Sequence, residues 1–76
     1  MIITVKLVGL LAGAAGFKEK TMEASDGTKA WDVFTRLALP VGEQWTRVSV
    51  NNRLAAKNQE LQDGDVLLFF PLGGGG

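Results

Sequence analysis

The residues of this chain that could take part in chemistry lie at its C-terminal end, in the run Gly73-Gly74-Gly75-Gly76. The reactive group there is the α-carboxylate of Gly76, which is anionic at neutral pH. A carboxylate is a poor electrophile, so acyl chemistry first requires a mixed anhydride, for example with AMP. The glycines follow a strand-like segment, and neither a helix nor a Lys comes after them, so they do not form a nucleotide-binding loop. Activation of Gly76 would therefore have to come from a partner enzyme.

A glycine run can also carry the C-terminal carboxylate away from the folded domain. It can pass through a channel too narrow for any Cβ, and the six residues after Phe70 span at most about 20 Å when extended. That length is enough to carry Gly76 from a docked domain into a neighbour's active site. The competing interpretation is a frayed end or a leftover linker with no function.

Two absences exclude most chemistry on the rest of the chain. The 76 residues contain no Cys and no His, which removes disulfides, thiolate nucleophiles, the commonest general base and the commonest metal ligand. A domain of this size also has little room for a ligand pocket of about 300–1,000 Å³. We therefore expect no independent enzyme activity, no metal site and no bound cofactor.

Composition narrows the class of protein further. A hydrophobic fraction of 46% indicates one small folded domain and excludes a disordered chain. The eight basic and eight acidic residues are intermixed, so the basic stripe of a nucleic-acid binder is absent. No apolar run approaches the roughly 20 residues that span a bilayer, and the start lacks the basic region of a signal peptide. We expect a cytoplasmic protein that binds neither nucleic acid nor membrane and is monomeric when free.

The elements that must position the tail begin with a predicted hairpin. Residues 2–8 and 17–24 both alternate with the period of a strand, the second more weakly. The Gly- and Ala-rich segment 10–16 between them is interpreted as a loop, which makes the two strands antiparallel neighbours.

A helix is predicted next. Residues 25–28 supply a turn, with Thr28 as the expected N-cap. Pro40 limits the helix at its other end, because the residue before a proline is pushed out of the helical region. Asp32 and Arg36 lie four residues apart and are expected to pair. The apolar residues that recur at helical spacing, with Trp31 and Phe34 expected to pack in the core, are Ala30, Trp31, Phe34, Leu37 and Ala38.

The C-terminal half predicts two more strands. After a linker over residues 41–45, residues 46–50 alternate as a strand that ends at the Asn51-Asn52 turn. Residues 55–60 are compatible with a strand, a helical turn or an irregular segment. Residues 66–70 are apolar on both faces, as in a central strand. The result is an α+β fold with a mixed four- to five-stranded sheet, one main helix across it, and the first and last strands parallel.

Three motifs resemble those of a known family, the ubiquitin-like β-grasp sulfur carriers of thiamine and molybdopterin biosynthesis (the ThiS/MoaD group). The first looks like the family's strand-ending Val-Asn and turn, the second its Leu-x-Asp-Gly-Asp segment, and the third its Phe-Phe-Pro followed by a terminal Gly-Gly. Leu72 departs from the usual second proline, and Gly73-Gly74 replace two bulkier residues. In this chain the motifs are Val50-Asn51-Asn52, Leu61-Gln62-Asp63-Gly64-Asp65-Val66, and Phe69-Phe70-Pro71 with Gly75-Gly76.

The resemblance implies a β-grasp domain over residues 1–72 and a flexible tail over 73–76. It implies that a ubiquitin-activating-like enzyme uses ATP to adenylate Gly76, with Gly75 as its required neighbour. A sulfur donor would convert Gly76 to a thiocarboxylate, and a synthase would accept the sulfur for molybdopterin or thiamine.

The last strand supplies the expected partner-docking residues. Its alternate side chains face opposite ways, so either Leu67 and Phe69 or the set Val66, Leu68 and Phe70 lies away from the helix. We favour Leu67 and Phe69 as the apolar patch. The full docking prediction is Leu67, Phe69, Phe70, Pro71 and Leu72.

Two other functions are compatible with the same sequence. Gly76 could end in an isopeptide bond to a lysine, as in a ubiquitin-like modifier. Alternatively, the chain could be a β-grasp interaction domain whose tail is irrelevant.

Overall fold

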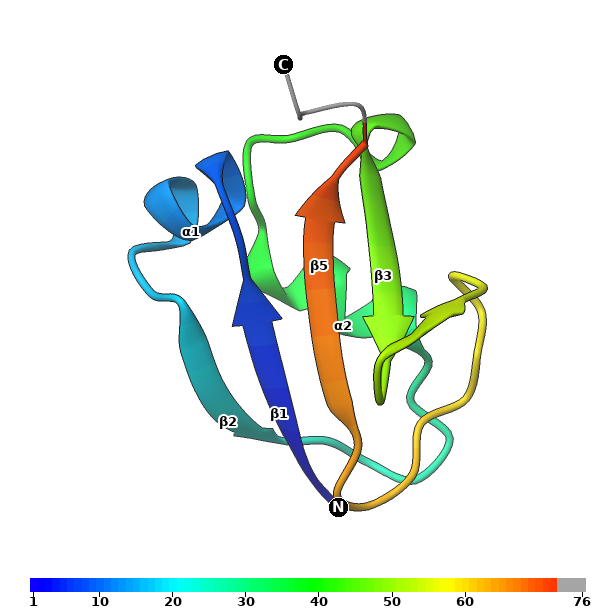
Figure 1. The fold of residues 1–76 in the computed structure, drawn as a ribbon. Helices are drawn as coiled ribbons and strands as arrows, with labels where there is room; N and C mark the ends of the chain where they lie inside the picture. Colours follow the sequence, from blue (N-terminus) through cyan, green and yellow to red (C-terminus); the bar gives the residue numbers. More distant parts are fainter. Residues whose placement is uncertain (73–76) are drawn as a thin grey trace.

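A mixed sheet of strand order β2-β1-β5-β3-β4 organises the described part of the chain, residues 1–72 of a computed structural model. Helix α2 packs across one face of this sheet, and within residues 1–72 no helix lies over the other face (Figure 1). The predicted α+β class, with a mixed sheet and one main helix, is confirmed. The elements are β1 (Ile2–Leu7), α1 (Leu10–Ala15), β2 (Glu19–Glu23), α2 (Ala30–Leu37), the 3₁₀ helix η1 (Glu43–Trp45), β3 (Thr46–Val50), β4 (Arg53–Ala55) and β5 (Val66–Pro71).

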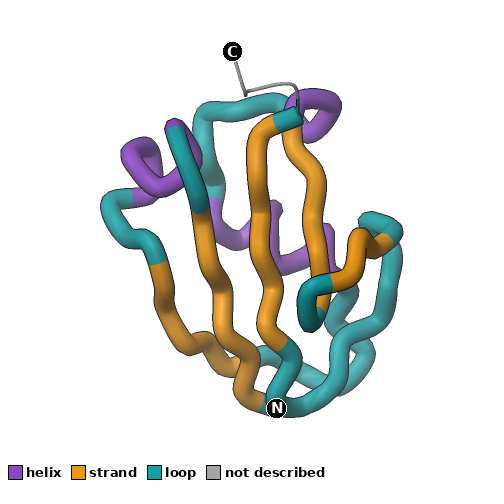
Figure 2. Tube along the Cα trace, viewed as in Figure 1, coloured by secondary structure: helices purple, strands orange, loops and turns teal. Residues whose placement is uncertain are grey.

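The two most apolar strands lie side by side at the centre of the sheet. β1 and β5 are parallel, with Thr4 opposite Val66 and Leu7 opposite Phe69. β1 also pairs with β2 in the predicted antiparallel hairpin, and β3 is antiparallel to β5. β5 therefore pairs on one side with β1 over residues 66–69 and on the other side with β3 over residues 67–71. Figure 2 shows the strands forming one continuous layer.

The core lies between the sheet and α2. Phe34 is 6% exposed, and its ring lies 5.3 Å from that of the fully buried Phe69. The half-buried Trp31 stacks on Phe34 at 4.2 Å, so the predicted core roles of both helix aromatics are confirmed. The other buried core residues are Ile3, Val5, Leu7, Leu11, Ala24, Ala30, Val33, Val48, Val50, Leu61 and Leu67.

The segment predicted as a loop over residues 10–16 is instead the short helix α1, and that prediction was wrong. Leu and Ala are strong helix formers, and the fully buried Leu11 fixes this turn against the sheet. Gly16 ends the helix in the left-handed region at φ 83°, and its N–H donates to the carbonyl of Ala12. The burial of Leu11, together with the favourable propensity of the alanines and leucines, outweighs the cost of Gly13.

Two details of α2 also differ from expectation. Its N-cap is Lys29 instead of Thr28, and the Lys29 N–H donates to the carboxylate of Asp32 at 2.9 Å. Arg36 donates to the carbonyl of Glu23 at 2.9 Å. Asp32 and Arg36 therefore do not form the predicted pair, because each has a backbone partner nearer to it.

The C-terminal half follows the predicted order with two refinements. The linker over residues 41–45 contains η1, and the ambiguous segment begins with Ala55 at the end of β4 and continues as irregular chain. Asn51 and Asn52 turn the chain with φ of 52° and 67°, as their tolerance of the left-handed region predicted.

Candidate functional site

Residues of the first two family motifs form a hydrogen-bond network at the start of β5. The Asn51 side chain donates to Asp65 at 2.9 Å and accepts from the Val66 N–H at 2.9 Å. The other Asp65 oxygen accepts from the Gln62 N–H at 2.8 Å. Asp63 accepts from the Ile2 N–H at 2.7 Å, which ties the start of β1 to the same turn. These side chains set the register of the central strands.

The predicted tail follows the opposite end of β5. Pro71 is half-buried, and Leu72 is 43% exposed. The Leu72 N–H donates to the Trp45 carbonyl at 2.6 Å, so η1 holds the last described residue in place. Gly9 lies against Pro71: a Cβ on Gly9 would sit 3.7 Å from Pro71 Cγ. The predicted reactive residues Gly75 and Gly76 lie outside the described residues.

The predicted docking pair Leu67 and Phe69 is not on the surface. Both side chains are fully buried and face α2, so the expectation that they form an exposed patch was wrong. The alternation along β5 places Val66, Leu68 and Phe70 on the other face instead, where each is half-buried. Both sets are apolar, so side-chain type alone could not distinguish the two faces.

An apolar stripe therefore runs along the uncovered face of the sheet. Leu68 pairs with Ser49 of β3, which pairs in turn with Leu54 of β4, so these three side chains share one face. Leu54 is 73% exposed, and it was not anticipated as a site residue although it follows the Asn turn by two positions. We call Val66, Leu68, Phe70 and Leu54 the open-face stripe.

Cations border the stripe on both sides. Lys6 of β1 lies opposite Leu68, and Arg47 of β3 lies opposite Phe70. Lys6 also reaches Glu19 at 3.9 Å, a contact between exposed groups that contributes little. A large apolar surface with a polar rim is typical of a protein-binding site.

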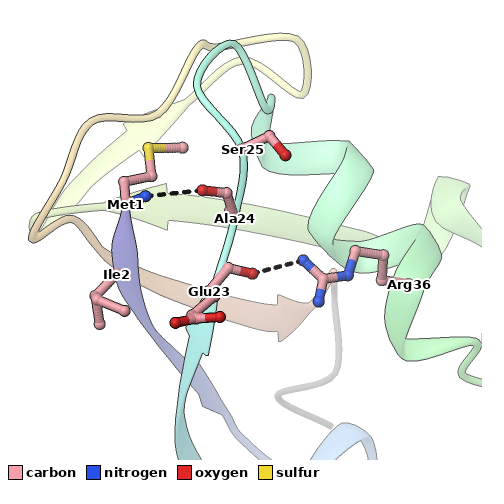
Figure 3. Close-up of a pocket in the computed structure, with 6 residues that line it drawn as sticks. All are labelled: Met1, Ile2, Glu23, Ala24, Ser25 and Arg36. Atoms are coloured by element: carbon pink, nitrogen blue, oxygen red, sulfur yellow. Dashed lines mark hydrogen bonds between the residues drawn. The ribbon is translucent and has the colours of Figure 1, made fainter.

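The hollow at the other end of the molecule has no comparable chemistry. Figure 3 shows it lined by Met1, Glu23 and Arg36 among others. The Met1 amino group donates to the Ala24 carbonyl at 2.9 Å, and Arg36 donates to that of Glu23, so both cations hold backbone oxygens. Within residues 1–72, no group of three or more acidic side chains is placed to hold a metal ion, and no helix is long and apolar enough to cross a membrane.

The fold and its uncovered apolar face define a small ubiquitin-like β-grasp protein. The sequence profile of the ThiS family matches residues 5–76, and the chain belongs to that family. The ThiS/MoaD resemblance of its motifs is thereby confirmed. Comparison with curated protein sequences gave no match.

Solved structures agree on the fold. SAMP1 from Haloferax volcanii is 25% identical, with both chains covered over 100% and a TM-score of 0.81. A putative molybdopterin converting factor subunit 1 from Pyrococcus furiosus is 26% identical over 95% of this chain and 98% of its own, with a TM-score of 0.80. A complex of subunits 1 and 2 of molybdopterin-converting factor from Helicobacter pylori contains a chain that is 22% identical, covered over 100% on both sides, with a TM-score of 0.70. The chain thus has the fold shared by sulfur carriers and ubiquitin-like modifiers.

Proposed function

We propose that this chain is a sulfur carrier that acts as the substrate of partner enzymes. An ATP-dependent enzyme of the ubiquitin-activating class adenylates Gly76, and a sulfur donor then converts it to a thiocarboxylate for molybdopterin- or thiamine-type cofactor synthesis. The observation that carries this proposal is the end of β5. The central strand finishes at Pro71, Leu72 is fixed to η1, and four residues without side chains follow.

The chemistry balances without any catalytic group on the chain. The Gly76 carboxylate attacks the α-phosphorus of ATP, pyrophosphate leaves, and an acyl adenylate forms. A sulfur nucleophile then displaces AMP, which carries away one former carboxylate oxygen, so the net change is the replacement of one oxygen by sulfur. The sulfur is held on the Gly76 carbonyl carbon, which is consistent with a chain that contains no Cys.

ATP is a reagent of the partner in this scheme, and the chain itself needs no bound cofactor. Because the activating enzyme draws on ATP, we place the chain in the cytoplasm.

The open-face stripe is the proposed docking surface for the activating enzyme. Its apolar side chains supply contact area, and Lys6 and Arg47 favour a partner surface with acidic groups around an apolar centre. The Helicobacter pylori relative is found in a protein–protein complex of two converting-factor subunits. By analogy, we propose that a sulfur-accepting synthase binds this chain as well.

A second function is favoured by one comparison. SAMP1 is a small archaeal modifier protein, and conjugation to a lysine would start from the same Gly76 adenylate. The tail supports either outcome, because what differs is the nucleophile that displaces AMP. A β-grasp interaction domain with an idle tail is the third possibility, and it requires no adenylation.

Reconstitution tests the carrier proposal. The chain is incubated with the adenylating enzyme of its own genome, ATP and sulfide, and its intact mass is measured. We expect the increase of a single oxygen-to-sulfur exchange on the C-terminal peptide, and none in a variant that lacks Gly75 and Gly76. Release of AMP without any mass change, together with lysine-linked products, would favour the modifier. No AMP release from the intact chain would contradict both.

A further inference from the structure

A second apolar surface lies at the end of the sheet, where the described chain finishes. It is a groove of about 490 Å³ between the start of α1, the segment that follows α2, η1 and the end of β5. These elements lie together at one end of the molecule in Figure 1. The groove is separate from the open-face stripe, because none of the four stripe residues lines it. Its main lining residues are Leu10, Pro40, Val41, Trp45, Pro71 and Leu72.

The groove forms where three uncharged parts of the sequence meet. Residues 7–17, 37–42 and 66–76 contain none of the chain's 16 charged side chains, although charged residues are intermixed everywhere else. The fold brings one part of each of these segments to the same place. A surface free of charge does not attract a partner by long-range electrostatics, and the side chains that line this groove are apolar, so we expect its contacts to be mainly apolar.

The large side chains of the groove face solvent. Leu10 is 59% exposed and Trp45 is 60% exposed. Trp45 makes no aromatic stacking contact within residues 1–72, whereas Trp31 is stacked in the core. The Trp45 backbone is nevertheless fixed, because its carbonyl accepts from the Leu72 N–H. An exposed Trp on a fixed backbone is a common anchor of protein interfaces.

We propose that this groove receives an apolar side chain of the enzyme that adenylates Gly76, a proposal that rests on the function proposed above. Gly76 lies four residues beyond Leu72, and four extended residues reach at most about 14 Å. Any enzyme that holds the Gly76 carboxylate must therefore bring its own surface close to the groove. The occupant is an aliphatic or aromatic side chain, because no residue that lines the groove carries a charge.

The groove would complement the stripe. The stripe determines which face of the domain contacts the enzyme. The groove holds the point where the tail leaves the domain against the enzyme. Both contacts exist in the bound ground state, so loss of the groove contact should raise KM for the chain and leave kcat unchanged.

The test measures AMP formation by the adenylating enzyme, with ATP and sulfide present, as a function of chain concentration, for Trp45→Ser, Leu10→Ser and a matched control, Ile2→Ser. Ile2 is an exposed apolar residue at the opposite end of the sheet, 47% exposed and beside the hollow of Figure 3. We expect each groove variant to raise KM about tenfold with kcat unchanged. The control should stay within about twofold of the wild type.

Fluorine NMR of the chain labelled with fluorotryptophan adds a direct readout, because there are only two Trp residues. Binding of the unlabelled enzyme should shift the Trp45 resonance and leave that of the core residue Trp31 in place. A raised KM with an unmoved Trp45 signal would overturn the proposal, because the effect would then be indirect.

The remaining outcomes separate this proposal from the function on which it rests. If the wild type forms AMP and Trp45→Ser keeps the wild-type KM, the groove proposal fails and the adenylation proposal stands. If the wild type forms no AMP, both fail. If the free chain dimerises in sedimentation and Trp45→Ser abolishes the dimer, the occupant is a second copy, and the proposal is again overturned.

Discussion

At the scale of single residues, Asn51 has the largest structural role for a side chain of its size. Its amide joins Asp65 to the Val66 N–H, and its backbone occupies the left-handed region at φ 52°. Both hydrogen bonds are exposed to solvent, so they stabilise the fold mainly by fixing the start of β5. The Asn51 motif therefore identifies the family through a structural requirement and not through chemistry.

The first prediction concerns this hydrogen-bond network. Asn51→Ala removes both side-chain hydrogen bonds and places alanine, which tolerates the left-handed region less well than asparagine, at positive φ. We therefore expect the free energy of unfolding to fall by about 1–3 kcal/mol. Asn52→Gly is the control, because Asn52 has φ 67° and no side-chain bond is found for it within the described residues. It should change stability by less than about 0.5 kcal/mol. Urea denaturation measures both, and equal losses would contradict the role of the amide.

The second prediction concerns the two phenylalanines of β5. Phe69→Ala should cost about 3–5 kcal/mol, because the ring is fully buried against Phe34, and a domain of this size should then be largely unfolded. Phe70→Ala should cost no more than about 1–2 kcal/mol, because the ring is half-buried on the open face. Circular dichroism during thermal unfolding distinguishes them. A folded Phe69→Ala together with an unfolded Phe70→Ala would reverse the assignment of faces.

The sequence predicted which residues of β5 are apolar, but it did not predict their direction. Leu67 and Phe69 alternate with Val66, Leu68 and Phe70, and both sets suit a buried position. Only the placement of α2 decides which set is covered. That placement is a tertiary property, which a pattern of period two does not contain.

At the scale of elements, α1 shows how local preference and packing combine. Its six residues include Gly13, and the same small residues that suggested a loop form one turn and a half of helix once Leu11 is buried. An isolated helix of this length would not form in water. Tertiary contact therefore decides a segment whose sequence was compatible with two structures.

The third prediction uses two glycines of this element. Gly13→Ala should stabilise the fold by about 0.5–1 kcal/mol, since a Cβ there meets nothing within 4 Å and alanine favours the helix. Gly16→Ala should destabilise it by about 1–2 kcal/mol, because Gly16 has φ +83°. The pair differs only in backbone conformation. Opposite shifts of the unfolding midpoint are expected, and shifts of the same sign would contradict the assignment of α1 and its cap.

The fourth prediction concerns Leu54 of β4. Leu54→Ser should leave the unfolding midpoint unchanged, because the side chain is 73% exposed. It should raise KM for adenylation about tenfold if the open-face stripe is the docking surface. Thr21→Ser on the edge strand β2, also exposed, serves as the control. Equal KM values for both variants would remove Leu54 from the interface.

At the scale of the whole molecule, topology was the part most open to prediction. The most apolar strands had to lie at the centre, and the crossover between them had to make them parallel, as β1 and β5 are. The groove at the end of the sheet was not foreseeable. Leu10, the segment 40–45 and Pro71 are far apart in sequence, and only the finished fold brings them together.

Across the whole molecule, we expect residues 1–72 to supply the stability and Gly76 to supply the chemistry. A variant that lacks Gly75 and Gly76 should therefore unfold at the same urea concentration as the wild type and yet form no AMP with the activating enzyme, ATP and sulfide. Lost stability in this variant would mean that the glycines belong to the folded domain.

The most direct test of the central claim is the intact mass of the chain purified from its native source. We expect a fraction of molecules in which one oxygen of the Gly76 carboxylate is replaced by sulfur, with the exchange mapped to the C-terminal peptide. An unmodified Gly76 in every molecule, together with Gly-Gly remnants of this chain on lysines of other proteins, would contradict it.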